Sequence, residues 1–194
     1  MNLLFVIISI SFRFDLAGYD FTVATKPQTY VFEHRKNFQY FTPLEISSIN
    51  VGRFVAFKPL SENSAIGLGV IGFKSNSLWV ADSENYYDHL KSFFPVQASY
   101  IYTIKHRNNL FVLGNYGEIS LWSIRDHDNP WMYLEYGLSF GWQPVNKISK
   151  RLGIILEMKL GQITMFYDYK PPVDLTSWYI TFGLASGGYF GKFF

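Results

Sequence analysis

The chain has 194 residues and a formal net charge of +2, and 20% of its residues are aromatic while only 16% are charged. An average soluble domain has roughly 25% charged residues, so this chain has too little charge to cover an ordinary soluble surface. Its basic residues are scattered, which excludes a nucleic-acid footprint. It has no cysteine, which excludes disulfides, thiolate zinc sites and cysteine nucleophiles. The length fits a single domain spanning residues 1–194.

The first segment of the chain can be interpreted as a signal peptide or as a strand. Its first ten residues are apolar, but no Lys or Arg precedes them and no small-residue cleavage site follows. Residues 8–16 alternate strictly between apolar and polar side chains, which predicts a β-strand. We therefore interpret residues 1–18 as containing the first strand rather than part of a signal peptide. No later stretch has the roughly 18 consecutive apolar residues of a membrane helix, so any membrane insertion must be as a barrel.

Alternation with a period of two continues along the chain. Further strands are predicted, in chain order, at residues 44–58, 64–74, 94–105, 109–123, 133–143, 152–160 and 178–185. The segments 44–58 and 109–123 change face part-way, which indicates a bulge in each. Only Ile155 breaks the alternation of residues 152–160. With the first strand the total is about eight, which predicts an all-β fold, a closed antiparallel up-and-down β-barrel.

The connections between these strands alternate in length. Long connections are expected at about 24–43, 75–93 and 161–177, with a loop at Asp126–Pro130 and short turns at Lys58–Asn63, Lys105–Asn109 and Pro144–Arg151. Long and short connections then lie at opposite ends, and an even strand count leaves both termini at the short-turn end. This asymmetry is typical of outer-membrane barrels.

The two faces of the predicted strands differ in composition. One face is rich in small residues: Gly67, Gly69, Gly137, Ser139, Gly141, Gly153 and Gly183. Inside a narrow barrel small residues make room for longer neighbours, whereas exposed strand glycines would only cost stability. The other face is bulky and uncharged, which suits contact with hydrocarbon. Aromatic residues also gather near the predicted strand ends, where membrane interfaces favour them: Trp79, Tyr86, Tyr87, Trp122, Trp131, Tyr133, Trp142, Tyr167, Tyr169 and Trp178.

With these features, and with the aromatic pair Phe193-Phe194 at its end, the chain resembles the small eight-stranded outer-membrane barrels of Gram-negative bacteria. The resemblance implies a monomeric, porin-like transmembrane protein of the bacterial outer membrane. Its implied partners are membrane lipid, including lipopolysaccharide, and the barrel assembly machinery that reads a terminal Phe. The alternation before the terminus is broken, and the Gly187-Gly188 pair offers a place for the last strand to bend or end.

Six charged residues are predicted to point into the barrel: Arg53, Lys105, Glu118, Glu135, Glu157 and Lys159. A charge in a narrow lumen must be paired or solvated, so we expect a hydrogen-bonded ion-pair network that closes the bore. A proton or ion path is the alternative interpretation.

No catalytic, cofactor or metal site is predicted. The four histidines have no metal-ligand spacing: His34, His89, His106 and His127. One arrangement resembles the lipid A palmitoyltransferase barrel, because His34 falls in the first long loop and Asp82-Ser83 in the second. The resemblance implies acyl transfer near the outer surface, with Ser83 activated by a base.

Three functions stay open at this point. The first is a non-enzymatic barrel whose loops Lys26–Thr42 and Ser75–Phe93 serve adhesion, envelope integrity or passage of a small solute. The second is the membrane-embedded acyltransferase. The third is a soluble lipocalin-like binder with its apolar face inward. A closed interior packed with four residues of the apolar face would exclude the two membrane interpretations: Leu138, Phe140, Leu156 and Phe182.

Overall fold

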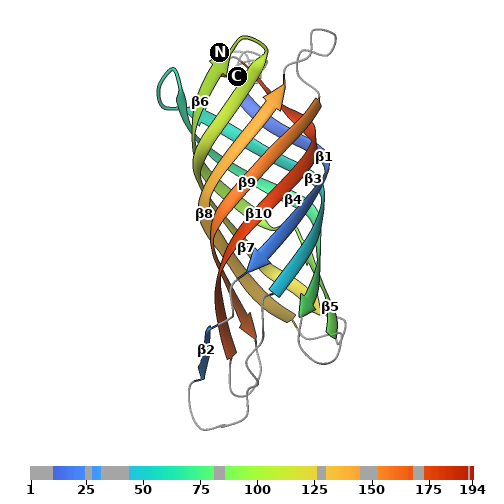
Figure 1. Ribbon diagram of the computed structural model, residues 1–194. Helices are drawn as coiled ribbons and strands as arrows, with labels where there is room; N and C mark the ends of the chain where they lie inside the picture. Colours follow the sequence, from blue (N-terminus) through green and yellow to red (C-terminus); the bar gives the residue numbers. More distant parts are fainter. Residues whose placement is uncertain are drawn as a thin grey trace.

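The computed structural model describes residues 11–24, 28–31, 44–80, 86–125, 130–144, 153–167, 173–191 and 193–194, which form one antiparallel sheet closed into a barrel (Figure 1). Its strands are β1 (Ser11–Ala24), β2 (Gln28–Val31), β3 (Leu44–Pro59), β4 (Ser64–Val80), β5 (Tyr86–Phe93), β6 (Val96–His106), β7 (Asn109–Arg125), β8 (Pro130–Pro144), β9 (Gly153–Tyr167) and β10 (Val173–Phe190). Pairing of β1 with β10 closes the ring. This confirms the closed eight-strand barrel, because β5 and β6 occupy one barrel position and β2 only adds to an end of β10.

The barrel has two different ends. The start of β1, the end of β10 and the turns between β3 and β4 and between β6 and β7 lie at one end, called the terminal end below, which is uppermost in Figure 1. The opposite end, called the loop end, lies where β1, β4, β7 and β9 finish. The even number of barrel strands produces this arrangement, as predicted from the sequence.

The fourth barrel position is divided between β5 and β6. Both strands pair with β4 and β7, so they continue one another across Phe94 and Pro95. Phe94 has a φ of 54°, a left-handed conformation that is uncommon for a bulky side chain. The Phe94 amide donates to the Gly72 carbonyl at 3.3 Å, and the Ile71 amide donates to the Pro95 carbonyl at 3.0 Å. β4 therefore stays hydrogen-bonded across the break between β5 and β6.

Two of the expected long connections are wrong. Residues 75–93 lie largely in β4 and β5, and residues 161–177 lie largely in β9 and β10. Backbone pairing continues in these segments although their side chains no longer alternate strictly between apolar and polar. The sequence prediction relied on that alternation, so it ended the strands too early. His89 therefore lies in a strand rather than a loop. The strands consequently reach further toward the loop end than the pattern predicts.

The predicted bulges have different outcomes. Gly52, with a φ of 70°, marks a change of face in β3, so that Asn50 and Arg53 both point into the lumen. In β7 the face is constant from Leu110 to Ser120, and the irregularity comes later, between Ser120 and Ser123.

An unpredicted bulge lies in β1 between Asp15 and Ala17, opposite Gly187 of β10. The Gly187-Gly188 pair does not end β10, which continues to Phe190. The irregularity in this pair of strands therefore lies in β1.

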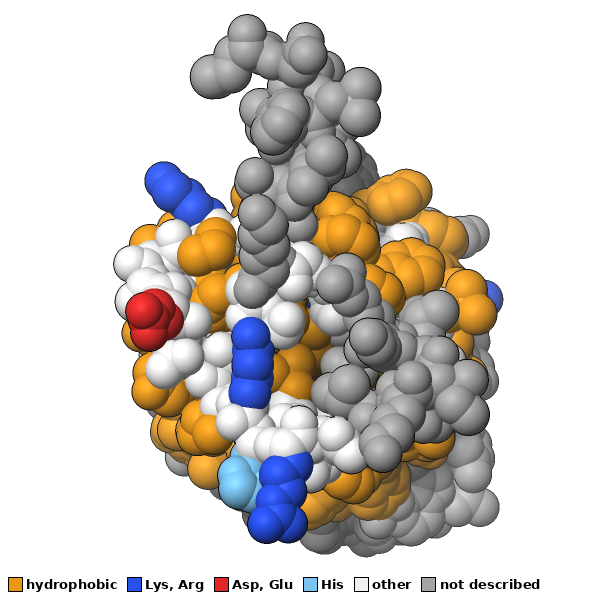
Figure 2. All heavy atoms as spheres, turned by 90° about the horizontal axis from the view of Figure 1, so that it is seen from above, with side chains coloured by type: hydrophobic (Ala, Val, Ile, Leu, Met, Phe, Trp, Pro, Cys, Tyr) orange, Lys and Arg blue, Asp and Glu red, His pale blue; other side chains and the backbone are white. Residues whose placement is uncertain are grey.

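The apolar face of the strands points outward. Leu138 is 60% exposed and Phe182 is 55% exposed, and Phe140 and Leu156 are also exposed. Figure 2, a view onto the terminal end, shows hydrophobic side chains around the circumference, with polar side chains and backbone over the end itself. These observations confirm the membrane orientation and show that the lipocalin-like interpretation is wrong.

The glycine-rich face points inward and leaves room for longer side chains, as predicted. A Cβ added to Gly183 would collide with the carboxylate of Asp20, and one added to Gly67 would lie 2.6 Å from the ring of Phe57. Both glycines therefore make space for a neighbour that fills the lumen.

Candidate functional site

The middle of the lumen contains a cluster built on two arginines. Glu157 of β9 accepts hydrogen bonds from Arg13 of β1 and, at 3.0 Å, from Arg53 of β3. Asp15 lies 2.6 Å from Nη2 of Arg13 and 3.5 Å from Nη1 of Arg53. All four side chains are at most 9% exposed. This arginine cluster fastens β1, β3 and β9 to each other across the lumen.

A second cluster is built on a lysine. Lys74 of β4 lies 2.7 Å from Glu118 of β7 and 3.2 Å from Glu135 of β8. The two glutamates are directly opposite each other in the sheet, so the Lys74 ammonium is needed to offset their repulsion. The hydroxyl of Tyr133 donates to Glu118, and two more tyrosines donate to Glu135: Tyr116 at 2.8 Å and Tyr179 at 2.9 Å. We call Lys74, Glu118, Glu135 and these tyrosines the lysine cluster.

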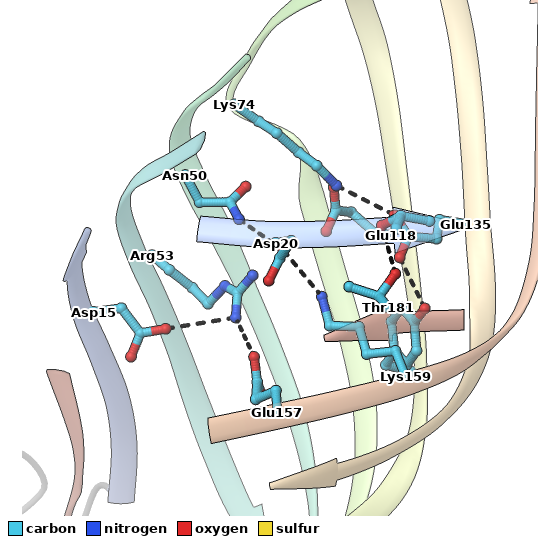
Figure 3. Close-up of polar contacts among 12 residues, drawn as sticks. Asp15, Asp20, Asn50, Arg53, Lys74, Glu118, Glu135, Glu157, Lys159 and Thr181 are labelled. Atoms are coloured by element: carbon cyan, nitrogen blue, oxygen red, sulfur yellow. Dashed lines mark hydrogen bonds and ion pairs between the residues drawn. The ribbon is translucent and has the colours of Figure 1, made fainter. Parts of the chain in front are cut away.

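A third set of contacts, around Asp20, lies between the two clusters (Figure 3). Asp20 accepts a hydrogen bond from Asn50 at 2.9 Å and lies 3.6 Å from the ammonium of Lys159. Counting these side chains together, four cations face five carboxylates: Arg13, Arg53, Lys74 and Lys159 against Asp15, Asp20, Glu118, Glu135 and Glu157. Near balance of charge is what permits so many ions in a space this dry.

The terminal end of the lumen is apolar instead. A contiguous group of buried side chains fills it: Val55, Phe57, Ala65, Ile101, Leu110, Val112, Ile155, Ala185, Tyr189 and Phe193, with Phe194 packed against them. We call this group the apolar plug. It explains why Ile155 breaks the alternation of its strand and why β7 seemed to change face, since Leu110 and Val112 face inward too. Tyr189 joins the plug to the arginine cluster, because its hydroxyl accepts a hydrogen bond from Arg13 at 3.2 Å.

The spaces left inside the barrel are small. Two cavities of about 20 Å³ each lie between the lumen side chains, one beside Gln97 and one beside Asn76. The side-chain oxygens of Gln97 and Asn76 are buried without a hydrogen-bond partner. A space of this size beside an unpaired oxygen suits a single water molecule. The two spaces share no lining residue, so they are separate from each other.

The structure places most of the predicted lumen charges as expected. Arg53, Glu118, Glu135 and Lys159 are buried in the lumen, and Glu157 joins them in the arginine cluster. This agrees with the predicted ion-pair network, while the alternative of a proton or ion path stays untested.

Lys105 was predicted to point inward and join the lumen network, but its side chain is exposed. It is exposed one residue before the end of β6, next to a tight turn in which Arg107 has a φ of 54°. β6 extends beyond the packed part of the lumen at this point, so a side chain at an inward-facing position is no longer buried.

Four lumen charges were missed by the sequence analysis: Arg13, Asp15, Asp20 and Lys74. Arg13 and Asp15 occupy the polar face of an alternating segment, a signal that could have identified them. Lys74 could not be found this way, because it has the same parity as the outward residues Ile66 and Leu68. The irregularity of β4 opposite the Phe94-Pro95 break turns it inward.

The predicted aromatic residues at the strand ends divide between two locations. Trp142 and Trp178 lie on the outer surface, which suits an interface girdle. Tyr133 is buried in the lysine cluster, so its assignment to a girdle is wrong. The other aromatic side chains of that prediction lie outside the described side chains.

The candidate acyl-transfer residues His34, Asp82 and Ser83 lie outside the described residues, so acyl transfer stays a prediction. Among residues that are described, no three His, Asp or Glu side chains are arranged to hold a metal ion. The same residues include no helix long and apolar enough to cross a membrane.

A closed antiparallel barrel with an apolar circumference and an ion-paired lumen is a transmembrane β-barrel, with the architecture of bacterial outer-membrane proteins. No family model matches this chain, and no curated protein matches its sequence. A solved structure similar to it is that of the outer membrane protease OmpT from Escherichia coli, with a TM-score of 0.28 and 9% sequence identity over 92% of this chain and 95% of that chain. The class of the protein therefore rests on the geometry described above.

Proposed function

We propose that this protein is a closed, non-conducting barrel of the bacterial outer membrane that anchors its extramembrane segments in a structural or adhesin-like role. The observation that carries the proposal is the filled lumen. The apolar plug, the arginine cluster and the lysine cluster follow one another along it, and two cavities between their side chains measure about 20 Å³ each. A lumen filled in this way supports anchoring over passage of a solute, because a solute would have to displace paired charges.

The length of the strands supports the same role. A transmembrane strand needs only about 9–11 residues. The strands β4 and β10 have 17 and 18 residues, and β2 adds further pairing to the start of β10. The excess extends the loop end of the barrel into a rigid platform. By analogy with barrels of this class, that end faces the outside of the cell, where binding segments on a rigid scaffold usually act.

Conductance in a planar lipid bilayer tests whether the barrel is closed. We expect the purified, refolded protein to produce no single-channel steps, while a general porin under the same conditions does. Steady conductance steps from the unaltered protein would contradict the proposal.

Cell-surface behaviour tests the anchoring role. Residues 32–43, which connect β2 to β3, are replaced by a Gly-Ser linker of equal length, and the control carries the same exchange at Leu60–Asn63 of the terminal end. Heat-modifiable gel mobility first verifies that both variants fold. We expect the first exchange alone to reduce autoaggregation and adhesion of intact cells. Equal adhesion by both variants and by cells without the protein would overturn the adhesin-like role.

A further inference from the structure

The two small cavities of the lumen are alike in size but differ in their electrostatic surroundings. Each measures about 20 Å³, and each lies beside a buried amide oxygen that has no hydrogen-bond partner, from Gln97 in one and from Asn76 in the other. The cavity beside Gln97 adjoins the arginine cluster, whereas the cavity beside Asn76 adjoins the lysine cluster. The second is called the Asn76 cavity below. The charge around each cavity decides what can fill it.

The lysine cluster has an excess of negative charge. In the arginine cluster two guanidinium groups face two carboxylates, and the carboxylate of Asp20 faces the ammonium of Lys159. In the lysine cluster Lys74 alone faces both Glu118 and Glu135 (Figure 3). Among the lumen side chains that the structure describes, the excess of one carboxylate therefore belongs to the lysine cluster. A buried charge without a counter-ion is costly, so this cluster calls for one more positive charge.

The tyrosines around Glu135 meet only part of that need, because a hydroxyl donates a hydrogen bond but has no charge. Tyr116 and Tyr179 donate to one oxygen of Glu135 at 2.8 and 2.9 Å, and Lys74 lies 3.2 Å from the other. A carboxylate can accept at about four positions, so one position of Glu135 remains. Glu135 also lines the Asn76 cavity, which places the remaining position beside a space of suitable size.

The walls of the Asn76 cavity are rich in oxygen. Asn76 is 5% exposed, and its Oδ1 is buried without a hydrogen-bond partner. Carbonyl, carboxylate and hydroxyl oxygens are the ligands that hard cations prefer. A dehydrated sodium ion is no larger than a water molecule, so a space of about 20 Å³ can hold one. Five wall residues carry side-chain oxygen: Thr22, Ser48, Asn76, Glu135 and Tyr179.

We propose that the Asn76 cavity binds one sodium ion, with Oδ1 of Asn76 and the carboxylate of Glu135 as its principal ligands. The ion supplies the positive charge that the lysine cluster lacks. The carboxylate of Glu135 then bridges the ion and the ammonium of Lys74, which is also part of the wall. A divalent ion fits less well, because it would turn the negative excess into a positive one and normally takes several carboxylates. Beside Gln97, where the charges balance, a water molecule suffices.

The dependence of stability on sodium tests this site. The full-length protein is refolded into vesicles of phosphatidylcholine, whose headgroups have no net charge, and unfolded in urea at increasing NaCl. Choline chloride keeps the ionic strength constant, and choline is too large for the cavity. An ion bound at one site of the folded state alone raises the folding equilibrium constant about tenfold for each tenfold rise in concentration above its Kd, which equals about 1.4 kcal/mol.

Three variants and a control locate the effect. Asn76→Leu removes a ligand, and Glu135→Gln removes the excess charge while Lys74 keeps Glu118 as its partner, so in both we expect the NaCl and choline curves to coincide. Asn76→Asp adds a carboxylate and should tighten sodium binding, which a loss of packing would not do. The control Gln97→Leu removes the unpaired oxygen beside the other cavity and keeps the tenfold response. Heat-modifiable gel mobility verifies that each variant folds.

Three results would overturn the proposal. Coinciding curves for the unaltered protein would mean that the Asn76 cavity holds water. An equal sodium response in the unaltered protein and in Asn76→Leu would place the ion elsewhere. Stability that rises as the pH is lowered, with no response to sodium, would mean that Glu118 and Glu135 share a proton instead. These outcomes are independent of conductance and of adhesion, so the sodium site and the anchoring role are tested separately.

Discussion

The middle of the lumen and its terminal end solve the same problem in opposite ways. Both must be filled, and both lie behind the same apolar outer surface. The middle is filled with paired charges, whereas the terminal end is filled with Phe57, Tyr189 and other apolar side chains. Because the charged side chains of the middle are at most 9% exposed, they must satisfy one another. The comparison teaches that lipid requires apolar side chains over the whole outer surface of such a barrel. The lumen can hold either charged or apolar side chains, provided that they fill it and that the polar groups have partners.

The largest expected effect comes from breaking the arginine cluster. Glu157→Leu removes the carboxylate that bonds to both Arg13 and Arg53 and leaves two buried guanidinium groups to share Asp15. Removing one partner of a buried ion pair costs about 3–5 kcal/mol. Urea unfolding of the vesicle-embedded protein, followed by tryptophan fluorescence, measures the change. Glu62→Gln, in an exposed turn at the terminal end, is the control and leaves the unfolding curve in place.

The apolar plug is tested by Phe57→Ala. The ring packs against Tyr189 and Phe194, with centroid distances of 6.3 and 5.3 Å, and its loss leaves a cavity behind. We expect a destabilisation of about 3 kcal/mol in the same assay. The matched control is Phe54→Ala in the same strand, which faces lipid, so that hydrocarbon fills the space that it vacates. An equal loss in the two variants would mean that the plug does not pack as a core.

A charge on the outer surface sharpens the contrast between inside and outside. Leu138→Arg places a cation among lipid chains, on the outer face of β8, whose inner face carries the ion-paired Glu135. The expected cost is about 2 kcal/mol, since depth in the bilayer sets it and the long side chain can reach toward the headgroups. Comparison of unfolding in vesicles of different thickness measures it. A thicker bilayer should increase the cost, and independence of thickness would contradict a lipid-facing Leu138.

The smallest expected effect comes from two neighbouring residues of β9. Ile155 is fully buried in the plug, and Ile154 is 55% exposed on the outer surface. Ile155→Val should destabilise the protein by about 1 kcal/mol, because a methylene is lost from a packed site. Ile154→Val should have a smaller effect in the same unfolding assay. The reverse order would mean that the inner and outer faces of β9 have been exchanged.

Much of this architecture could be predicted from the sequence because membrane barrels repeat one simple rule. In the segment 133–143 the outward residues Leu138 and Phe140 and the inward residues Glu135 and Ser139 all face as the alternation indicates. Because the outer surface must be apolar and the inner surface must leave room for long side chains, the alternation along a strand alone shows which residues face outward.

The inward position of some residues could not be predicted. The alternation along a strand gives the wrong face where strand pairing is irregular, and it gives no contrast between the faces where the lumen is apolar. Lys74 is turned inward by the irregularity in β4, which depends on where the neighbouring strand breaks at Phe94. Ile155 broke the alternation of its segment because it belongs to the apolar plug, which is built from five or more segments distant in sequence. The strands extend past the expected boundaries because backbone pairing does not require alternating side chains.

The orientation of the apolar face is the central claim, and spin labelling tests it most directly. Because the chain has no cysteine, a single Cys can be placed at Leu138, Leu156 or Phe182 and labelled with a nitroxide after refolding into vesicles. The account predicts that all three labels collide readily with molecular oxygen dissolved in the lipid and rarely with a water-soluble nickel chelate. Labels shielded from both reagents would place these side chains in a closed interior and contradict the account.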